Sequence, residues 1–303
     1  MRTSLFCFVG DGGGRSPVEA YLDEVRSARD EGFAAVWTSQ LPHEADLPTL
    51  LAVALREVDG IALGTAVLPI QVRHPMVLAQ TALTLDLISP GRLRLGIGLS
   101  HAMVSEGMWG IPFDRPARRV AEYLDVLLPL LAGEEAAASG ETVSGKGRLQ
   151  IPGAGGPPVY LAALGPRLLE IAGSRTAGTV TWMTGPKTLA GHTVPTLRRA
   201  AEAAGRTAEV IVGLPVCVTD DEAAARKLAR RQFAIYGRLP SYRAMLDREG
   251  YAGPEDAAIV GDEAAVRERL DELAAVGVDE LTAVVFGAGE DRGRTRAFLR
   301  GRA

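Results

Sequence analysis

The sequence predicts an α/β fold of the (β/α)8 class, a TIM barrel with a small excursion after the fourth helix. Short apolar runs alternate with longer amphipathic stretches along the chain, which is typical of repeated strand–helix units. Eight such runs are present, as a barrel requires, and 303 residues suffice for one barrel of about 250 residues with additions. We therefore expect residues 1–303 to form a single barrel domain. An open doubly wound sheet is the alternative.

The expected elements follow from this alternation. The eight strands are short apolar runs at residues 5–9, 34–38, 61–68, 93–99, 159–163, 179–183, 210–218 and 281–286. The helices are expected at residues 16–31, 47–58, 76–88, 117–131, 166–173, 189–204, 221–236, 266–276 and 292–299. The first helix has the clearest boundaries, because Ser16 suits an N-cap, Pro17 the first helical position and Gly32 the end.

Residues 132–158 interrupt the alternation. This stretch is rich in glycine and proline and has two β-prone pieces, near residues 142–143 and 149–151. We interpret it as an excursion from the barrel and not as a linker between domains.

Composition excludes several classes of protein. The net charge is −4 with both signs spread along the chain, so no basic surface for nucleic acid is evident. No apolar run approaches the ~20 residues that span a bilayer, and the first segment lacks the apolar core of a signal peptide. We expect a cytoplasmic protein with reduced thiols, because Cys7 and Cys217 alone form neither a disulfide framework nor a zinc site.

The carboxyl ends of the strands should carry the chemistry of a barrel. They contain no paired carboxylates, no HExxH motif, no GxSxG elbow and no phosphate-binding GxxxxGK[ST] loop. The groups present are mainly backbone, hydroxyl and apolar. Such a set suits a bound cofactor that brings its own reactivity.

The turn from Leu164 to Arg167 is the most informative local feature. Gly165 ends the fifth strand, Pro166 opens a helix, and the first amides of that helix should be free to bind an anion beside Arg167. An ordinary strand-to-helix turn with proline in the first helical position is the alternative.

Four histidines are present, and His101 is the best candidate for acid–base chemistry or substrate contact because it follows the fourth strand. His192 is expected to be structural or to face solvent. No two histidines have the close spacing of metal ligands, so we expect no metal site.

Several glycines permit two interpretations. Gly64, Gly96 and Gly98 lie in expected strands, where glycine indicates either close approach of a ligand or tight packing. The run Gly12-Gly13-Gly14 is either a flexible loop or a close approach of backbone to ligand, and it does not fit a dinucleotide-binding GxGxxG.

The remaining candidates are aromatic and charged. Trp37, Trp109 and Trp182 either wall a ligand or pack in the core. Arg118 and Glu122 are four residues apart on one helix, so we expect a solvated ion pair between them.

Several segments together resemble the bacterial luciferase-like family, and they extend over essentially the whole chain. They are Leu63-Gly64-Thr65-Ala66-Val67, Arg73-His74-Pro75, Ile88-Ser89-Pro90-Gly91-Arg92, Leu95-Gly96-Ile97-Gly98, Arg115-Pro116 with Arg119 and Glu122, Ala162-Ala163-Leu164-Gly165-Pro166-Arg167, Val260-Gly261-Asp262 and Gly277-Val278-Asp279.

The resemblance implies a (β/α)8 barrel that binds either reduced FMN or the deazaflavin coenzyme F420. It further implies a non-prolyl cis peptide at Gly64-Thr65-Ala66 behind the cofactor ring, and a phosphate site at the helix after strand 5. The implied cofactor-binding residues are Ser39, Gln40, Gly64, Thr65, Ala66, Gly98, Ala163, Leu164, Gly165, Pro166, Arg167 and Thr181.

Two details bear on the branch and the reaction. The Gly-Pro-Arg sequence and the stretch Trp37-Thr38-Ser39-Gln40 resemble the deazaflavin branch. Dehydrogenases of that branch have an Asp-His pair where this chain has Gln40-Leu41, and some have a glutamate where it has His101. The resemblance therefore favours reduction of a C=C, C=N or C=O bond over oxidation of an alcohol.

The resemblance thus implies an F420-dependent oxidoreductase that transfers hydride between the deazaflavin and a small organic substrate, and the position of His101 after the fourth strand makes it the catalytic candidate. The alternatives are an FMNH2-dependent monooxygenase fed by a separate reductase, and a barrel that binds cofactor without catalysis. Family resemblance implies a homodimer. Neither nucleic acid nor a membrane is an expected partner.

Overall fold

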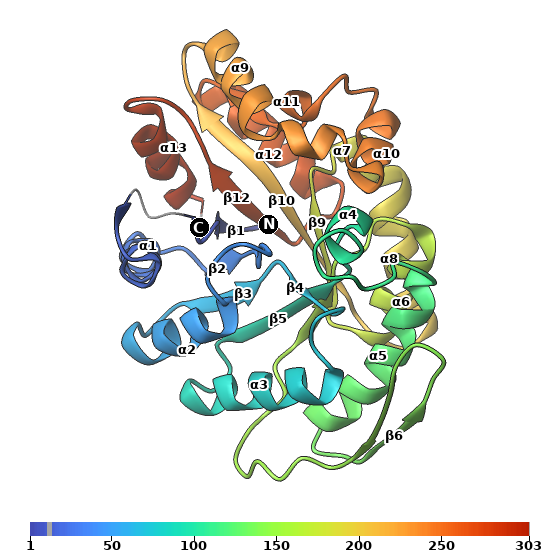
Figure 1. Ribbon diagram of the computed structural model, residues 1–303. Coiled ribbons are helices and arrows are strands. Elements are labelled where there is room, and N and C mark those ends of the chain that lie inside the picture. The colour runs from blue at the N-terminus through green and yellow to red at the C-terminus, as the bar shows by residue number, and fades with distance from the viewer. Residues whose placement is uncertain (11–13, 303) are drawn as a thin grey trace. The chain divides into compact units, whose positions relative to one another are not determined.

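The strands of the computed structural model, which describes residues 1–10 and 14–302, form a closed sheet (Figure 1). The barrel strands are β1 (Arg2–Cys7), β2 (Ala35–Thr38), β3 (Ala62–Thr65) followed by β4 (Leu68–Pro69), β5 (Leu93–Gly98), β8 (Val159–Leu161), β9 (Gly178–Trp182), β10 (Glu209–Val218) and β12 (Glu280–Val285). Their order is β10-β12-β1-β2-β3-β5-β8-β9, and β10 also pairs with β9. The predicted (β/α)8 barrel is confirmed.

The helices follow the strands in the expected alternation. They are α1 (Pro17–Asp30), α2 (Leu47–Glu57), α3 (Pro75–Ile88), α4 (Ala102–Ser105), α5 (Pro116–Leu131), α6 (Pro166–Arg175), α7 (Pro186–Thr188), α8 (Val194–Ala203), α9 (Glu222–Gln232), α10 (Pro240–Glu249), α11 (Pro254–Ala257), α12 (Glu263–Ala275) and α13 (Asp291–Arg300). A π-helical turn, η2 (Leu189–Thr193), precedes α8, and a 3-10 turn, η3 (Ala234–Gly237), follows α9. Among the described residues, none of these helices has both the length and the apolar character that crossing a membrane requires.

The chain divides into two compact units that alternate along the sequence. Unit 1 comprises Met1–Cys7, Ala28–Trp37 and Ala163–Ala303, and unit 2 comprises Phe8–Ser27 and Thr38–Ala162.

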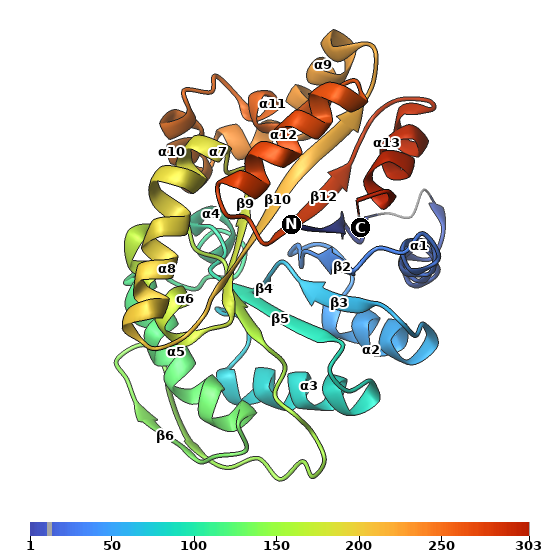
Figure 2. The ribbon, with the colours of Figure 1, turned by 180° about the vertical axis from the view of Figure 1, so that it is seen from behind.

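In unit 1 the long strand β10 pairs in parallel with β9, with β12 and with the short strand β11 (Ile259–Gly261). Figure 2 shows β10 and β12 side by side with α12 and α13 outside them. A buried polar cluster lies at the amino ends of β1 and β12, where the fully buried Glu280 carboxylate accepts hydrogen bonds from Ser4 Oγ at 2.5 Å and Trp37 Nε1 at 2.7 Å. Trp37 is therefore a core residue and walls no ligand site.

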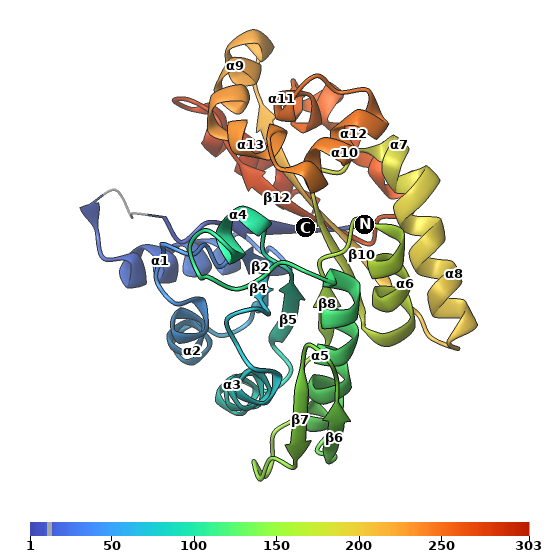
Figure 3. The same ribbon diagram turned by 45° about the vertical axis from the view of Figure 1, so that its right-hand side comes forward.

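In unit 2 the strands β3, β5 and β8 pair in parallel, and helix α3 packs against α2 and α5. The excursion is a two-stranded antiparallel hairpin, β6 (Ala136–Ser139) and β7 (Ser144–Gly147), which packs on α5 (Figure 3). The β-prone pieces expected near residues 142–143 and 149–151 were misplaced. Residues 142–143 form the turn of the hairpin, because their amides bind a carboxylate of α5 and are unavailable for a strand ladder.

Other departures from the predicted elements are local. The expected strand at 61–68 is divided into β3 and β4, and the peptide bond between Ala66 and Val67 in the interruption is cis. The elements α4, α7, α10, α11 and β11 were not predicted from the sequence. Gly12 and Gly13 of the glycine run lie outside the described residues, whereas Gly14 adopts a positive φ of 86° that suits glycine.

Candidate functional site

Strand β3 of unit 2 ends in a backbone arrangement fixed by two hydrogen bonds. Thr65 Oγ1 donates to the Gly96 carbonyl at 2.6 Å, and the Ala66 amide donates to the Thr38 carbonyl at 2.7 Å. The cis peptide follows directly, between Ala66 and Val67. The resemblance led us to expect such a bond at residues 64–66, and it lies at the last of these residues.

Close packing accounts for two glycines of strand β5. A Cβ atom on Gly96 would lie 1.8 Å from the Thr65 carbonyl oxygen, and a Cβ atom on Gly98 would lie 2.7 Å from Val67 Cγ2. Since backbone and side chains of β3 and its continuation fill this space, the packing interpretation explains both residues. Contact of Gly98 with a cofactor remains a prediction.

The loop after β2 carries Ser39 and Gln40. Ser39 is buried, and its Oγ atom has no hydrogen-bond partner in the described part of the chain. The Gln40 amide is already used within its own loop, because Oε1 accepts from the Leu47 amide at 2.7 Å and Nε2 donates to the Leu41 carbonyl at 2.9 Å. A cofactor contact by Gln40 would therefore use its backbone, and this contact remains a prediction.

His101 follows β5 and is the N-cap residue of α4. Its carbonyl accepts from the amides of Val104 and Ser105, at 2.9 and 2.8 Å. Burial lowers the pKa of the His101 imidazole below its ordinary value, so the ring is predominantly neutral near pH 7. In this form one ring nitrogen donates and the other accepts a hydrogen bond, which suits contact with a polar substrate group.

Sequence reasoning missed Gln71, which follows β4. Its Oε1 accepts from the Ser100 amide at 3.2 Å and so fixes the backbone next to His101, whereas its buried Nε2 has no hydrogen-bond partner among the described residues. The sequence holds no signal for this contact, because it joins two loops 29 residues apart.

In unit 1 the turn before α6 leaves the amino end of that helix open. Gly165 is the N-cap residue and has no side chain of its own to cap the helix, and within residues 1–10 and 14–302 no other side chain accepts a hydrogen bond from the amides of Arg167 or Leu168. The backbone of Gly165 is extended, with φ −82° and ψ 155°, and a Cβ atom there would meet nothing within 4 Å. Neither conformation nor packing within the protein requires glycine here, so the space is free for a ligand beside the first amides of the helix.

The next helix shows the opposite arrangement. At the amino end of α7, the Glu249 carboxylate from α10 accepts from the amides of Lys187 at 3.2 Å and Thr188 at 2.5 Å. A Cβ atom on Gly185 would lie 2.6 Å from that carboxyl group. A carboxylate of the protein therefore already binds this helix end, whereas no described carboxylate binds the first amides of α6.

Three further residues of unit 1 bear on the candidate site. Arg167 is exposed and forms no ion pair with any residue that the structure describes. His192 lies on the π-helical turn η2 and donates from Nε2 to the Leu164 carbonyl at 2.9 Å. This contact agrees with a structural role for His192, which is to hold the turn before α6. Thr181 on β9 is buried, and its Oγ1 has no hydrogen-bond partner within residues 1–10 and 14–302.

Trp182, at the end of β9, belongs to an aromatic cluster within unit 1. Its ring lies 5.4 Å from the ring of Phe6 and 5.4 Å from that of Tyr236, between ring centroids. These packing distances favour the core interpretation of Trp182.

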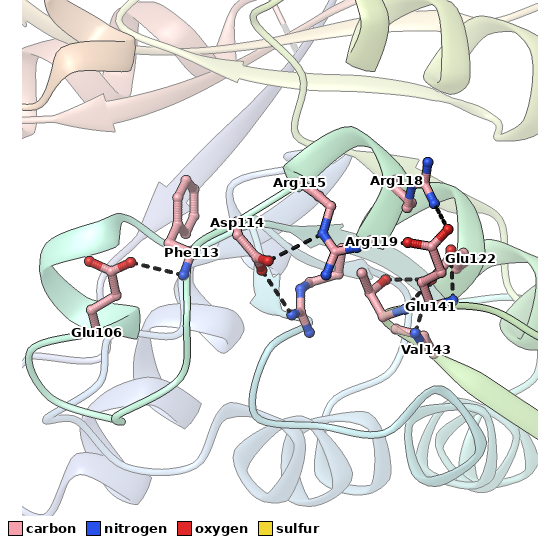
Figure 4. A network of polar contacts seen from close by, with 10 residues as sticks. Glu106, Phe113, Asp114, Arg115, Arg118, Arg119, Glu122, Glu141 and Val143 are labelled. Carbon is pink, nitrogen blue, oxygen red and sulfur yellow. Dashed lines mark hydrogen bonds and ion pairs between the residues drawn. The ribbon is translucent and has the colours of Figure 1, made fainter.

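The charged entry to α5 differs from its predicted form (Figure 4). Arg118 pairs with Glu141 of the hairpin and not with Glu122, so the expected helical pair was wrong. Glu122 instead accepts from Thr142 Oγ1 and from the amides of Glu141, Thr142 and Val143. A helical surface pair contributes only ~0.2–0.5 kcal/mol, which is less than several hydrogen bonds to one carboxylate provide.

Burial alone would raise the pKa of the Glu122 carboxyl group. The hydrogen bonds from Thr142, Val143 and Glu141 outweigh this effect and lower the pKa to about 2. Glu122 therefore remains ionised at all but strongly acidic pH, and it holds the hairpin against α5.

The described residues contain no cluster of three or more His, Cys, Asp or Glu side chains that could hold a metal ion. Cys7 and Cys217 are free and buried. Burial raises the pKa of the Cys217 thiol to about 11, so this thiol is a poor nucleophile.

The model of the luciferase-like monooxygenase family matches residues 1–280. The chain belongs to this family. A 5,10-methylenetetrahydromethanopterin reductase of Methanolobus tindarius is 29% identical over 220 residues, which cover 72% of this chain and 67% of the relative.

Solved structures show the same fold. The coenzyme F420-dependent tetrahydromethanopterin reductase of Methanopyrus kandleri matches with a TM-score of 0.83 and 21% identity, over 100% of this chain and 98% of that one. The oxygenating constituent of 3,6-diketocamphane monooxygenase from Pseudomonas putida, in complex with FMN, matches with a TM-score of 0.78 and 18% identity, over 100% and 97%. Proteins of this fold therefore include a reductase described as coenzyme F420-dependent and a monooxygenase solved in complex with FMN.

Proposed function

We propose that this luciferase-like protein is an F420-dependent oxidoreductase that transfers hydride between the deazaflavin coenzyme and a small organic substrate. Reduction of a C=C, C=N or C=O bond is the direction that we propose. The open turn before α6 is the observation that carries this proposal.

The turn fits a phosphate group. Gly165 leaves space that no protein atom occupies within 4 Å of an added Cβ, the helix is uncapped, and Arg167 is exposed beside it. Free amides at a helix N-terminus together with a guanidinium group form a favourable site for a phosphate ester. At the neighbouring helix α7 the Glu249 carboxylate already accepts hydrogen bonds from the first amides, so of these two helix ends only that of α6 has amides available to a ligand.

Support for the deazaflavin comes from similarity. The methylenetetrahydromethanopterin reductase is 29% identical, and the tetrahydromethanopterin reductase of similar fold is described as coenzyme F420-dependent. The Gly165-Pro166-Arg167 sequence agrees with the deazaflavin branch. FMN is the alternative cofactor, with which the chain would act as a monooxygenase.

The protein's own residues have distinct roles in this proposal. The bound coenzyme in its reduced form supplies the hydride. Gly165, Pro166 and Arg167 would form its phosphate site, in which the amides at the start of α6 and the Arg167 guanidinium would donate and Pro166, which has no N–H, would shape the turn. His192 holds the Leu164 carbonyl so that the turn keeps its shape. His101, fixed through the Gln71–Ser100 hydrogen bond, contacts the polar end of the reducible bond and hydrogen-bonds the atom that gains a proton.

The test is turnover in the absence of oxygen. Protein loaded with reduced F420 is mixed with short α,β-unsaturated ketones and imines, and oxidation of the coenzyme is followed by absorbance. The proposal predicts turnover that His101→Ala abolishes while coenzyme binding persists. Oxygen consumption with reduced FMN, without turnover of F420, would assign the monooxygenase function instead. Coenzyme binding that never leads to turnover would favour a non-catalytic barrel.

A further inference from the structure

The segment from Ser100 to Phe113 connects β5 to α5 and includes α4. It begins two residues beyond Gly98, the last residue of β5, and contains His101. Loops at the carboxyl ends of barrel strands form the active sites of such enzymes. The side chains of this segment therefore lie on the same loop as the proposed substrate contact.

Hydrogen bonds within the segment hold its shape. Ser105 is fully buried, its Oγ donates to the Ile111 carbonyl at 2.8 Å, and the Ile111 amide donates to the Ser105 carbonyl at 2.8 Å. The Phe113 amide donates to the Glu106 carboxylate at 3.0 Å, as Figure 4 shows. Polar contacts within the segment thus contribute to the order of its backbone.

Those apolar side chains are unusually exposed. Met103 and Met108 are each 58% exposed, more than any other large hydrophobic side chain in the described part of the protein. Trp109, Ile111 and Phe113 are half-buried in the same segment. Glu106 is the one charged residue between Ser100 and Phe113, and the Phe113 amide already binds it. Exposed apolar side chains that gather in one segment mark a binding surface more often than scattered ones do, and these five lie within residues 103–113.

We propose that Met103 and Met108 bind the apolar part of the substrate, so that the substrate is a hydrophobic molecule whose reducible group lies at His101. Methionine is suited to this contact because its flexible thioether chain adapts to apolar surfaces of different shapes. A substrate composed only of polar groups, such as a sugar phosphate, gains nothing from these side chains. The inference rests on the proposed function, which supplies the reaction but does not specify the shape of the substrate.

Binding of saturated ketones tests the inference without any turnover. The protein, loaded with whichever of F420 and FMN it binds, is titrated calorimetrically with 2-pentanone, 2-heptanone and 2-nonanone. We expect Kd to fall about fourfold for each methylene that contacts the methionines, which corresponds to ~0.8 kcal/mol per methylene. In the double variant Met103→Ser/Met108→Ser, the Kd values of the three ketones should differ from one another by less than twofold. The Kd of the cofactor should not change.

Val18→Ser is the matched control, because Val18 is a 37% exposed apolar residue on α1. In Val18→Ser, the Kd of the ketones should depend on their chain length as strongly as in the wild type. The inference would be overturned if the Kd of the ketones depended on chain length equally in the methionine double variant, or did not depend on chain length in the wild type. The inference would also be overturned if the double variant had a different molecular mass in solution and the same dependence of Kd on ketone chain length. The methionines would then lie in a contact with a second copy of the chain. Absence of hydride transfer leaves the ketone measurement intact and counts against the proposed function alone.

Discussion

His192 Nε2 donates a hydrogen bond of 2.9 Å to the carbonyl oxygen of Leu164. The contact joins the π-helical turn before α8 to the turn before α6, 28 residues earlier in the sequence. Leu164 directly precedes Gly165, the N-cap residue of α6. His192 therefore fixes the backbone just before the helix amides that are available to a ligand. This relationship connects a histidine remote in sequence to the proposed phosphate site.

Substitution of His192 by alanine should weaken cofactor binding through the shape of this turn. We expect a Kd about three- to tenfold higher, because one hydrogen bond contributes ~0.5–1.5 kcal/mol to the ordered turn. Fluorescence titration of the cofactor measures the effect, and His192→Asn, which retains a donor, should recover part of it. An unchanged Kd in the alanine variant would remove His192 from the site.

Gly165→Val separates folding from ligand binding. The added side chain begins in space with no protein atom within 4 Å of its Cβ, and the extended backbone accepts any residue, so the free energy of unfolding should change by less than about 1 kcal/mol. Cofactor binding should be lost, because the side chain occupies the place of the phosphate. Denaturation and titration of the same sample check both statements. A stable variant with wild-type affinity would refute the phosphate site.

Glu122→Gln should loosen the hairpin β6–β7 from α5. Glutamine offers one acceptor oxygen where the carboxylate offers two, and its NH2 group faces backbone amides, so we expect a loss of about 1–2 kcal/mol in the free energy of unfolding. Amides 141–143 should exchange faster with solvent. Arg118→Ala is the control, since its exposed pair with Glu141 should contribute less than ~1 kcal/mol.

The Glu122 carboxylate also makes the free energy of unfolding depend on pH, so that stability decreases as the pH falls. The pKa of Glu122 is about 2 in the folded protein and ~4.3 in an unfolded chain, so the unfolded state takes up the proton first as the pH falls. Its stabilisation is complete above about pH 4.3 and disappears toward pH 2. Acid unfolding should therefore be less steep in Glu122→Gln than in the wild type. Equal steepness in the two proteins would contradict the hydrogen-bonding scheme at the hairpin turn.

The homodimer implied by family resemblance is a proposal that α3 makes testable. Val77 and Leu87 on this helix are 51% and 43% exposed, and the exposed positions between them, Gln80 and Thr84, carry no charge. A second copy that packs on this face would remove both apolar side chains from water. Leu87→Glu should convert a dimer to a monomer in size-exclusion chromatography with light scattering. A dimer that persists in this variant would exclude the α3 face.

The sequence predicted most strands and helices because each has a periodic apolar pattern of its own. The strand ending at Trp182 and the helix beginning at Pro166 both lie within a few residues of their expected bounds. The hairpin was misplaced because its turn depends on Glu122, which is about 20 residues away, and not on local β propensity. Similarly, α10 lacks a strong apolar pattern, although its Glu249 binds the first amides of α7.

The candidate site residues likewise fall into those that local sequence indicates and those whose contacts join distant segments. The sequence indicated Gly165, Arg167 and His101 as candidates because a Gly-Pro-Arg turn and a histidine at strand ends have direct local meaning, and their roles stay predictions. It did not reveal the contacts of His192 or Gln71, since each joins segments about 30 residues apart through a single hydrogen bond. Gly98 was attributed to a ligand by resemblance, whereas the contacts of Val67 and Ala162 already explain why it is glycine.

Fluorescence titration of wild type and Arg167→Ala with F420 and with FMN tests the central claim most directly. The account predicts tight binding of F420, weak binding of FMN, and a several-fold weaker F420 affinity in the variant because an exposed guanidinium group beside α6 is lost. Preference of the wild type for FMN, or an F420 affinity that Arg167→Ala leaves unchanged, would contradict it.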